Sequence, residues 1–186
     1  ANWLADQEEG TPEWLGLTYR KREDLRYGEN PHQRGALYTP TQDTSDEPAG
    51  LGVASAEQLG GKALSFNNLQ DVTAAALAAD AFPRQSAVAI IKHGNPCGIA
   101  VGGSIADAYR SALACDPLSA FGGVVAANRA VDEGAAREIA QVFTEVVLAP
   151  GFSPAALEIL RGKKNLRILE LPDVLRQRWD RRFVNG

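Results

Sequence analysis

A short apolar run that stops abruptly constrains the fold of this chain more than any other feature. Residues 87–91 read Ala-Val-Ala-Ile-Ile, and a short run rich in β-branched residues is typical of a buried strand. Lys92 and His93 follow directly, and Gly94 and Pro96 then indicate a tight turn. Strand-like and helix-like segments alternate beyond this point. Because alternating strands and helices pack as layers, the sequence predicts an α/β fold.

The other expected elements follow from apolar spacing and capping residues. A polar loop is expected from Thr39 to Gly50. The elements are a helix from Val72 to Ala81 capped by Asp71, a helix after Ser104 with Ile105, Ala108, Tyr109 and Ala112 on its apolar face, a strand from Phe121 to Ala127, a helix from Asp132 to Val147, a helix from Ser153 to about Gly162, and a strand from Leu166 to Leu171.

The pair Lys92–His93 is the first candidate for chemistry. Ligands of open α/β sheets bind beyond the carboxyl ends of the strands, which is where this pair lies. Histidine suits proton transfer near neutral pH, and a lysine can stabilise developing negative charge. An arbitrary Lys-His pair more often caps a strand and faces water. Other motifs in this chain favour a functional role here.

A second polar cluster spans residues 26–33 and contains His32, the other of the 2 histidines. Arg26 offers a planar fork suited to a phosphate, and Tyr27 places a hydroxyl beside it. Tyr-Gly and Asn-Pro pairs are also ordinary turn chemistry. Taken alone, the cluster is therefore equally compatible with a binding loop and with a structural loop.

Several long motifs, in order along the chain, resemble the transformylase part of the bifunctional purine-biosynthesis enzymes AICAR transformylase/IMP cyclohydrolase. A single such motif would not be specific, whereas the whole series is. The matching segments are Leu25–Gln33, Ser65–Asp71, Ile91–Gly98, Asp116–Gly123 and Glu145–Gly151, and the similarity continues into Leu166–Leu171.

The resemblance implies a three-layer α/β/α, cytidine-deaminase-like fold, of which this chain carries the first of two repeats. Residues 1–20 are then expected to be a linker or the tail of an absent upstream cyclohydrolase domain, and residues 21–186 the first transformylase subdomain. The chain contains no Met and opens on Ala1-Asn2-Trp3, so we expect it to be a piece of a longer protein.

The resemblance also implies an activity and two catalytic residues. A formyl group passes from 10-formyltetrahydrofolate, the co-substrate, to the 5-amino group of AICAR, a phosphoribosyl aminoimidazole carboxamide. His93 matches the family's general base, and Lys92 matches the cation that stabilises the tetrahedral intermediate. A homodimer with sites at the subunit interface is implied as well, and most of the folate site is expected in the absent second half.

Six residues match positions that hold the substrate in the family. Arg26 and Tyr27 match nucleotide-binding positions, and Gly122 matches a backbone contact beside Phe121, which can pack on the base. Glu145 stands where some relatives have Asp, and either carboxylate could accept from the ribose hydroxyls. Asn68 lies in a matched motif and is expected on the substrate side.

Two other chemistries fit this sequence less well than formyl transfer does. A zinc deaminase needs His-x-Glu and Pro-Cys-x-x-Cys, but Gly94-Asn95 follows His93, and Gly98-Ile99-Ala100 follows Cys97. No catalytic metal is therefore expected. Cys97 is close to His93 in sequence, but a thiolate nucleophile needs a geometry that closeness in a turn does not supply.

Four glycines between Gly94 and Gly103 precede the Ser104-capped helix. Backbone amides at such a helix start can hold an anion. A merely flexible glycine loop explains the same composition equally well.

Net charge, apolar content and the number of cysteines limit the classes of function and the cellular compartments that are expected for this chain. The net charge of −4 argues against broad nucleic-acid binding. The sequence has no apolar stretch long enough to cross a membrane. The 2 cysteines suggest no disulfide framework, so a cytoplasmic location is expected. The alternative function is a non-catalytic nucleotide-binding or dimerisation module.

Overall fold

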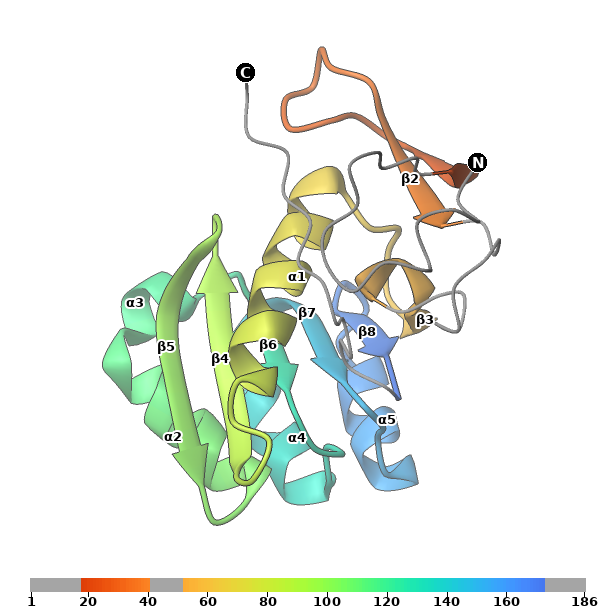
Figure 1. The fold of residues 1–186 in the computed structure, drawn as a ribbon. Helices are drawn as coiled ribbons and strands as arrows, with labels where there is room; N and C mark the ends of the chain where they lie inside the picture. Colours follow the sequence, from red (N-terminus) through yellow and green to blue (C-terminus); the bar gives the residue numbers. More distant parts are fainter. Residues whose placement is uncertain (1–17, 41–51, 173–186) are drawn as a thin grey trace, which may run out of the picture.

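The computed structural model describes residues 18–40 and 52–172, which form a small hairpin and a larger mixed sheet (Figure 1). The hairpin pairs two strands, and the sheet has 6 strands in the order β3-β8-β7-β6-β4-β5. The strands are β1 (Tyr19–Leu25), β2 (Gly35–Pro40), β3 (Glu57–Gly60), β4 (Ser86–Lys92), β5 (Asn95–Gly102), β6 (Gly123–Ala127), β7 (Thr144–Ala149) and β8 (Arg167–Glu170). The helices are α1 (Phe66–Asp80), α2 (Ile105–Cys115), α3 (Pro117–Ala120), α4 (Glu133–Ile139) and α5 (Pro154–Arg161), with a 3₁₀ turn η2 at Val53–Ser55.

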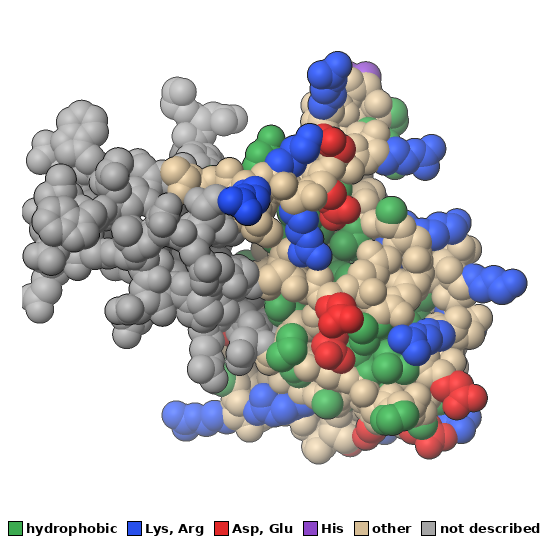
Figure 2. Space-filling view, turned by 90° about the vertical axis from the view of Figure 1, so that its right-hand side faces the viewer, with side chains coloured by type: hydrophobic (Ala, Val, Ile, Leu, Met, Phe, Trp, Pro, Cys, Tyr) green, Lys and Arg blue, Asp and Glu red, His purple; other side chains and the backbone are tan. Residues whose placement is uncertain are grey.

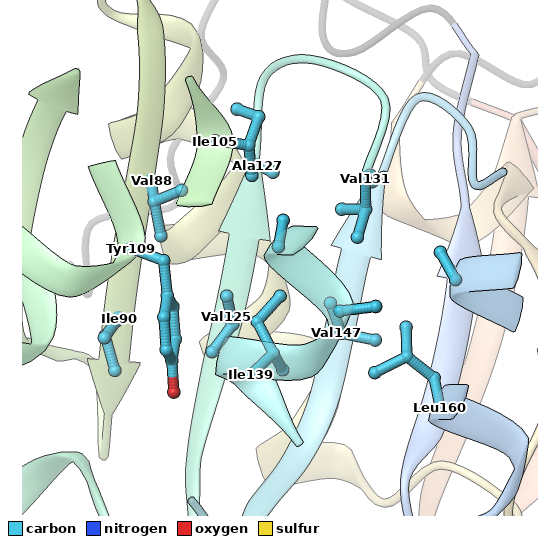
Figure 3. Close-up of a cluster of buried hydrophobic side chains, with 14 of the residues drawn as sticks. Val88, Ile90, Ile105, Tyr109, Val125, Ala127, Val131, Ile139, Val147 and Leu160 are labelled. Carbon is cyan, nitrogen blue, oxygen red and sulfur yellow. The ribbon is translucent and has the colours of Figure 1, made fainter. Parts of the chain in front are cut away.

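Helices cover both faces of the six-stranded sheet. Alternate residues of a strand point to opposite faces, so Val88 and Ile90 point to the sheet face that α2, α4 and α5 cover, where they lie beside Tyr109 of α2 (Figure 3). Ala89 and Ile91 face α1 on the other side. This arrangement confirms the predicted three-layer α/β/α class. The cytidine-deaminase-like name stays a prediction.

Strand direction decides which loops meet at each end of the sheet. β6, β7 and β8 run parallel to one another, whereas β4 is antiparallel to β6. The carboxyl end of β4 therefore meets the amino ends of β6 and β7. The rule that ligands bind beyond the carboxyl ends of the strands correctly places Lys92 and His93 at the end of β4. It does not predict that β6 and β7 begin at this same end, because it describes sheets in which all strands run parallel.

Several predicted elements are confirmed with small changes at their ends. β4 contains the expected apolar run, and β8 coincides with the predicted alternation. Ser104 and Ser153 cap α2 and α5, because each side chain accepts from the backbone N–H three residues later, that of Asp107 and that of Ala156. Tyr109 on α2 is fully buried, and this burial raises its pKa to about 12.

The first long helix begins six residues earlier than the sequence pattern predicts. Its N-cap is Ser65, whose side chain accepts from the Asn68 backbone N–H while the Asn68 side chain accepts from the Ser65 N–H. This reciprocal pair is a capping box. The prediction that Asp71 is the cap is therefore wrong. Asp71 lies within α1, and its carboxylate accepts hydrogen bonds from the backbone of His93 and Gly94.

The predicted helix from Asp132 to Val147 is wrong in its second half. Asp132 does cap a helix, but α4 ends at Ile139 and β7 begins at Thr144. β7 lies between β6 and β8, with helices on both faces. A strand buried on both faces is apolar throughout, so the helical spacing of Ile139, Val142, Phe143 and Val146 was coincidental.

The predicted glycine loop before Ser104 is instead strand β5, which pairs antiparallel with β4. Gly98 is needed for close packing, because a Cβ there would lie 1.9 Å from the Ala112 carbonyl oxygen of α2. The predicted strand from Phe121 also begins later, at Gly123. Phe121 caps the end of α3, and Gly122, with a φ of 76°, is not in the extended conformation of a strand.

The proposed linker at residues 1–20 lies outside the described residues, except for its last residues, where β1 begins at Tyr19. Most of the predicted loop from Thr39 to Gly50 also lies outside them. Among the helices described, none is long and apolar enough to span a membrane.

Candidate active site

The two catalytic candidates lie where a two-residue turn joins β4 to β5: Lys92 is the last residue of β4, and His93 is the first residue of the turn. Lys92 pairs with Asn95, so His93 and Gly94 form the loop between the strands. Their φ angles are 53° and 74°, and positive φ at both central residues is the mark of a type I′ hairpin turn. The His93 side chain is solvent-exposed. The turn thus presents an imidazole at the end of the sheet.

Lys92 is anchored to the loop that precedes β6. Its Nζ donates to the Phe121 carbonyl oxygen at 2.7 Å. Gly122, the next residue, donates its N–H to the Phe143 carbonyl at 2.7 Å. An ammonium has three donors, so Lys92 keeps donors for a ligand beside Phe121 and Gly122.

Glu145 and Asn68, predicted to contact substrate, are joined to each other at the same edge. Asn68 Nδ2 donates to Glu145 Oε2 at 2.9 Å. Arg167 Nη1 lies 3.7 Å from the same carboxylate oxygen, and Arg167 Nε donates to the Ala63 carbonyl at 3.1 Å. The amide and the guanidinium therefore fix the Glu145 carboxylate between α1, β7 and β8.

Arg26 and Tyr27 lie in the β1–β2 hairpin, outside the six-stranded sheet. The Arg26 guanidinium carbon is 5.7 Å from the centre of the Tyr27 ring. Lys and Arg side chains gather over this hairpin at the top of the space-filling view (Figure 2). The basic residues of the hairpin are Arg20, Lys21, Arg22, Arg26 and Arg34.

The hairpin contacts the rest of the domain through one backbone carbonyl and one side chain. Asn67 Nδ2, in the first turn of α1, donates to the Glu29 carbonyl at 3.5 Å. Arg22 also donates to the Ala54 carbonyl. Within residues 18–40 and 52–172, no hydrogen bond or ion pair joins Arg26 or Tyr27 to the Lys92–His93 turn. The structure therefore brings six of the eight predicted residues to one edge and leaves these two on the neighbouring hairpin.

Three apolar side chains lie exposed beside this edge. Leu118 is 86% exposed, Phe121 58% and Phe143 47%. The rings of Phe121 and Phe143 contact each other with centroids 5.2 Å apart. Asp116 caps the short α3 beneath them, and hydrogen bonds from Ser119 lower the pKa of its carboxyl. The cap fixes the loop that presents Phe121.

Cys97 does not have the surroundings of a nucleophile. Its burial, and then the charge of Asp116, raise the pKa of the thiol, and a reactive cysteine needs the opposite shift. The described part of the chain also holds no group of three or more His, Cys, Asp or Glu side chains that could bind a metal.

Two residues of this site were not predicted from the sequence. Asp71 accepts hydrogen bonds from the His93 and Gly94 backbone N–H groups at 3.1 and 2.7 Å, and Arg167 holds Glu145. Ser65 three residues before Asn68 is close to the capping-box pattern. With Ser65 as the cap, the Asp71 carboxylate is not needed to cap the helix and is available for the turn.

The fold and the edge cluster define an α/β domain with a candidate acid–base site, in which an exposed histidine follows an anchored lysine. The family model described as AICARFT/IMPCHase bienzyme matches residues 1–186. The chain therefore belongs to the AICARFT/IMPCHase bienzyme family.

Curated relatives agree with this assignment. The "Bifunctional purine biosynthesis protein PurH" of Cutibacterium acnes is 47% identical over 190 residues. The protein of the same name from Mycobacterium leprae is 48% identical over 193 residues. Each alignment covers 100% of this chain and 35% of the relative. The chain thus spans about a third of the length of these relatives.

Proposed function

We propose that this chain carries the catalytic pair of an AICAR formyltransferase in purine biosynthesis, as part of a bifunctional enzyme. The observation that carries the proposal is the meeting of Lys92, His93, Phe121, Gly122, Glu145 and Asn68 at one edge of the sheet. These residues come from separate motifs, and the family match covers all of them.

The chemistry assigns a different role to each member of the pair. The 5-amino group of AICAR is a poor nucleophile, because its ring and carboxamide withdraw the nitrogen lone pair. His93 removes a proton from this amine as the nitrogen bonds to the formyl carbon of 10-formyltetrahydrofolate. Negative charge then develops on the formyl oxygen, and the Lys92 ammonium stabilises it. The tetrahedral intermediate then collapses: the carbonyl forms again, the bond from the formyl carbon to the folate nitrogen breaks, and that nitrogen takes up the proton that His93 removed from the amine.

The surrounding residues suit a ribonucleotide. Arg26 binds the phosphate, with Tyr27 beside it. Glu145 accepts from the ribose hydroxyls, and Asn68 orients that carboxylate from the substrate side. Phe121 packs on the base, and the backbone at Gly122 contacts the substrate.

The remainder of the enzyme supplies what this chain lacks. The segment before β1 links this chain to an upstream cyclohydrolase domain, and the residues from β1 onward belong to the first transformylase subdomain. Most of the folate site lies in the following half. The enzyme is a cytoplasmic homodimer that binds AICAR and folate, and it binds neither nucleic acid nor a membrane.

One observation favours a second candidate, a non-catalytic nucleotide-binding or dimerisation module. The exposed Leu118, Phe121 and Phe143 side chains are the kind of apolar group that protein contacts cover. In that case the whole protein would bind AICAR, or dimerise, without transferring a formyl group. An assay of formyl transfer by the whole protein separates the two candidates.

Neutralising Arg26 should weaken substrate binding. We expect Arg26→Ala in the whole enzyme to raise the AICAR concentration for half-maximal rate by about 10- to 100-fold, because a lost charge-assisted hydrogen bond costs about 1.5–3 kcal/mol. Arg20→Ala is the matched control, since Arg20 is an exposed arginine near the start of the same hairpin. An AICAR dependence that Arg26→Ala leaves unchanged would remove Arg26 from the site.

Chelation should not affect the reaction. Glu and a second Cys are missing at the positions that a zinc deaminase requires, so we expect full formyl transfer after treatment with a strong chelator. Stoichiometric zinc by elemental analysis, together with loss of activity on chelation, would contradict this expectation.

A further inference from the structure

The His93–Gly94 turn is held by a carboxylate from a distant part of the chain. Asp71 Oδ2 accepts from the His93 N–H at 3.1 Å, and Asp71 Oδ1 accepts from the Gly94 N–H at 2.7 Å. One carboxylate thus uses one oxygen for each of the two turn residues. Asp71 lies on α1, 22 residues before His93 in the sequence.

The helix that supplies this carboxylate is firmly placed against the strand that leads into the turn. Val72, Ala75 and Ala76 on α1 are buried in the same cluster as Ala89 and Ile91 of β4. Asp71 itself is half-buried, whereas His93 and Gly94 are exposed. The carboxylate is therefore a fixed point, and the turn would otherwise project into solvent.

The turn needs such support because of its backbone conformation. His93 is the only residue other than glycine with a positive φ in the described part of the chain. Side chains with a Cβ adopt this left-handed region infrequently. Two hydrogen bonds from its own N–H and the next one to a fixed carboxylate favour this conformation over an extended one.

The conformation of the turn sets where the candidate base points. In an extended strand, Lys92 and His93 would point to opposite faces of the sheet. The positive φ at His93 breaks that alternation immediately after Lys92. Within the described residues, the imidazole itself makes no hydrogen bond to protein, so its direction depends on the backbone from which it projects.

We propose that Asp71 is a positioning residue for formyl transfer, which holds His93 in place through the turn backbone rather than through the imidazole. This inference rests on the proposed function, because it requires His93 to be the base. Asp71 touches neither substrate nor reacting atoms in this scheme. Its contribution is to keep the imidazole aligned with the amine that it deprotonates.

The test begins with Asp71→Ala in the whole enzyme. We expect kcat for formyl transfer to fall about 10- to 100-fold, because small misplacement of a catalytic group has effects of this size. The KM for AICAR should change little. Asp71→Asn keeps one acceptor oxygen and should recover part of the loss. Asp80→Ala is the control, since Asp80 is at the other end of the same helix and is half-buried too.

A double-mutant cycle with His93→Ala decides whether Asp71 acts through His93. If it does, Asp71→Ala should slow the wild-type enzyme but leave the His93→Ala enzyme no slower than before. If the two losses multiply instead, the inference is overturned. Should Asp71→Ala fail to fold, the isosteric Asp71→Asn is judged by the same cycle.

The cycle also separates this inference from the proposed function. If His93→Ala abolishes transfer and Asp71→Ala leaves kcat unchanged, the positioning role is wrong and the proposed function stands. If His93→Ala keeps near-normal turnover, the assignment of His93 fails, and the role of Asp71 fails with it.

Discussion

Replacing His93 with alanine in the whole enzyme is expected to slow formyl transfer by about 10²–10⁴-fold, the usual loss for a general base. Lys92→Ala should cost about 10²–10³-fold, because it removes the cation from the developing oxyanion. Both losses should be in kcat rather than in the KM for AICAR. Initial rates at saturating AICAR and 10-formyltetrahydrofolate measure them.

Two controls make this result specific to the chemistry. Lys62→Ala removes an exposed lysine between β3 and α1, and it should leave the rate unchanged. The cyclohydrolase activity expected from the upstream domain should persist in the His93 and Lys92 variants, which would report that they are folded. Near-normal turnover of His93→Ala at saturating substrate would show instead that His93 only caps the strand.

Adding a single methyl group at Gly98 should cause the largest loss of stability. The Cβ of Gly98→Ala would lie 1.9 Å from the Ala112 carbonyl oxygen and 2.8 Å from the Ala112 carbonyl carbon. Both are backbone atoms of α2, so the helix would have to move away from β5. Overpacking of this kind costs about 1–3 kcal/mol or more. We expect the upper end of this range, and a melting temperature lower by about 5–10 °C.

Gly103→Ala is the matched control for this substitution. It lies just beyond the same strand, and its added Cβ would meet only an Asp107 carboxylate oxygen at 3.6 Å, an ordinary contact. Thermal unfolding of the two variants and the wild type, followed by circular dichroism, gives the comparison. A Gly98→Ala melting temperature equal to that of Gly103→Ala would mean that α2 does not pack against β5 as described.

The sequence predicts correctly those elements that a run of apolar residues or a single capping residue marks. The apolar run at Ala87–Ile91 and the caps Ser104 and Ser153 needed only a few neighbouring residues to identify. The sequence predicts helix at β7 because Val146 continues the helical spacing of Ile139, Val142 and Phe143, although α4 ends at Ile139 and β7 begins at Thr144. Only its burial between β6 and β8 decides the question, and burial depends on pairings that are distant in the sequence.

The glycines after the turn were misinterpreted for a related reason. Composition alone suggested a flexible loop, but the space at Gly98 is taken by the backbone of α2. In the sequence, the close approach of β5 to α2 is indicated only by the glycine at position 98, and a glycine is equally common in loops.

The sequence motifs indicate which residues form the candidate site, but they do not predict the hydrogen bonds that join these residues. The positions of Lys92 and His93 follow from the strand that precedes them. The bonds from Asp71 to the turn and from Asn68 to Glu145 join residues 22 to 77 positions apart. No periodicity links such residues, so these contacts required the fold.

A crystal structure of the whole enzyme with AICAR bound tests the central claim most directly. The account predicts that an imidazole nitrogen of His93 lies about 2.6–3.2 Å from the 5-amino nitrogen of AICAR, and that Lys92 Nζ faces the side from which the formyl group arrives. AICAR bound away from the β4–β5 turn, or bound there with His93 directed into solvent, would contradict it.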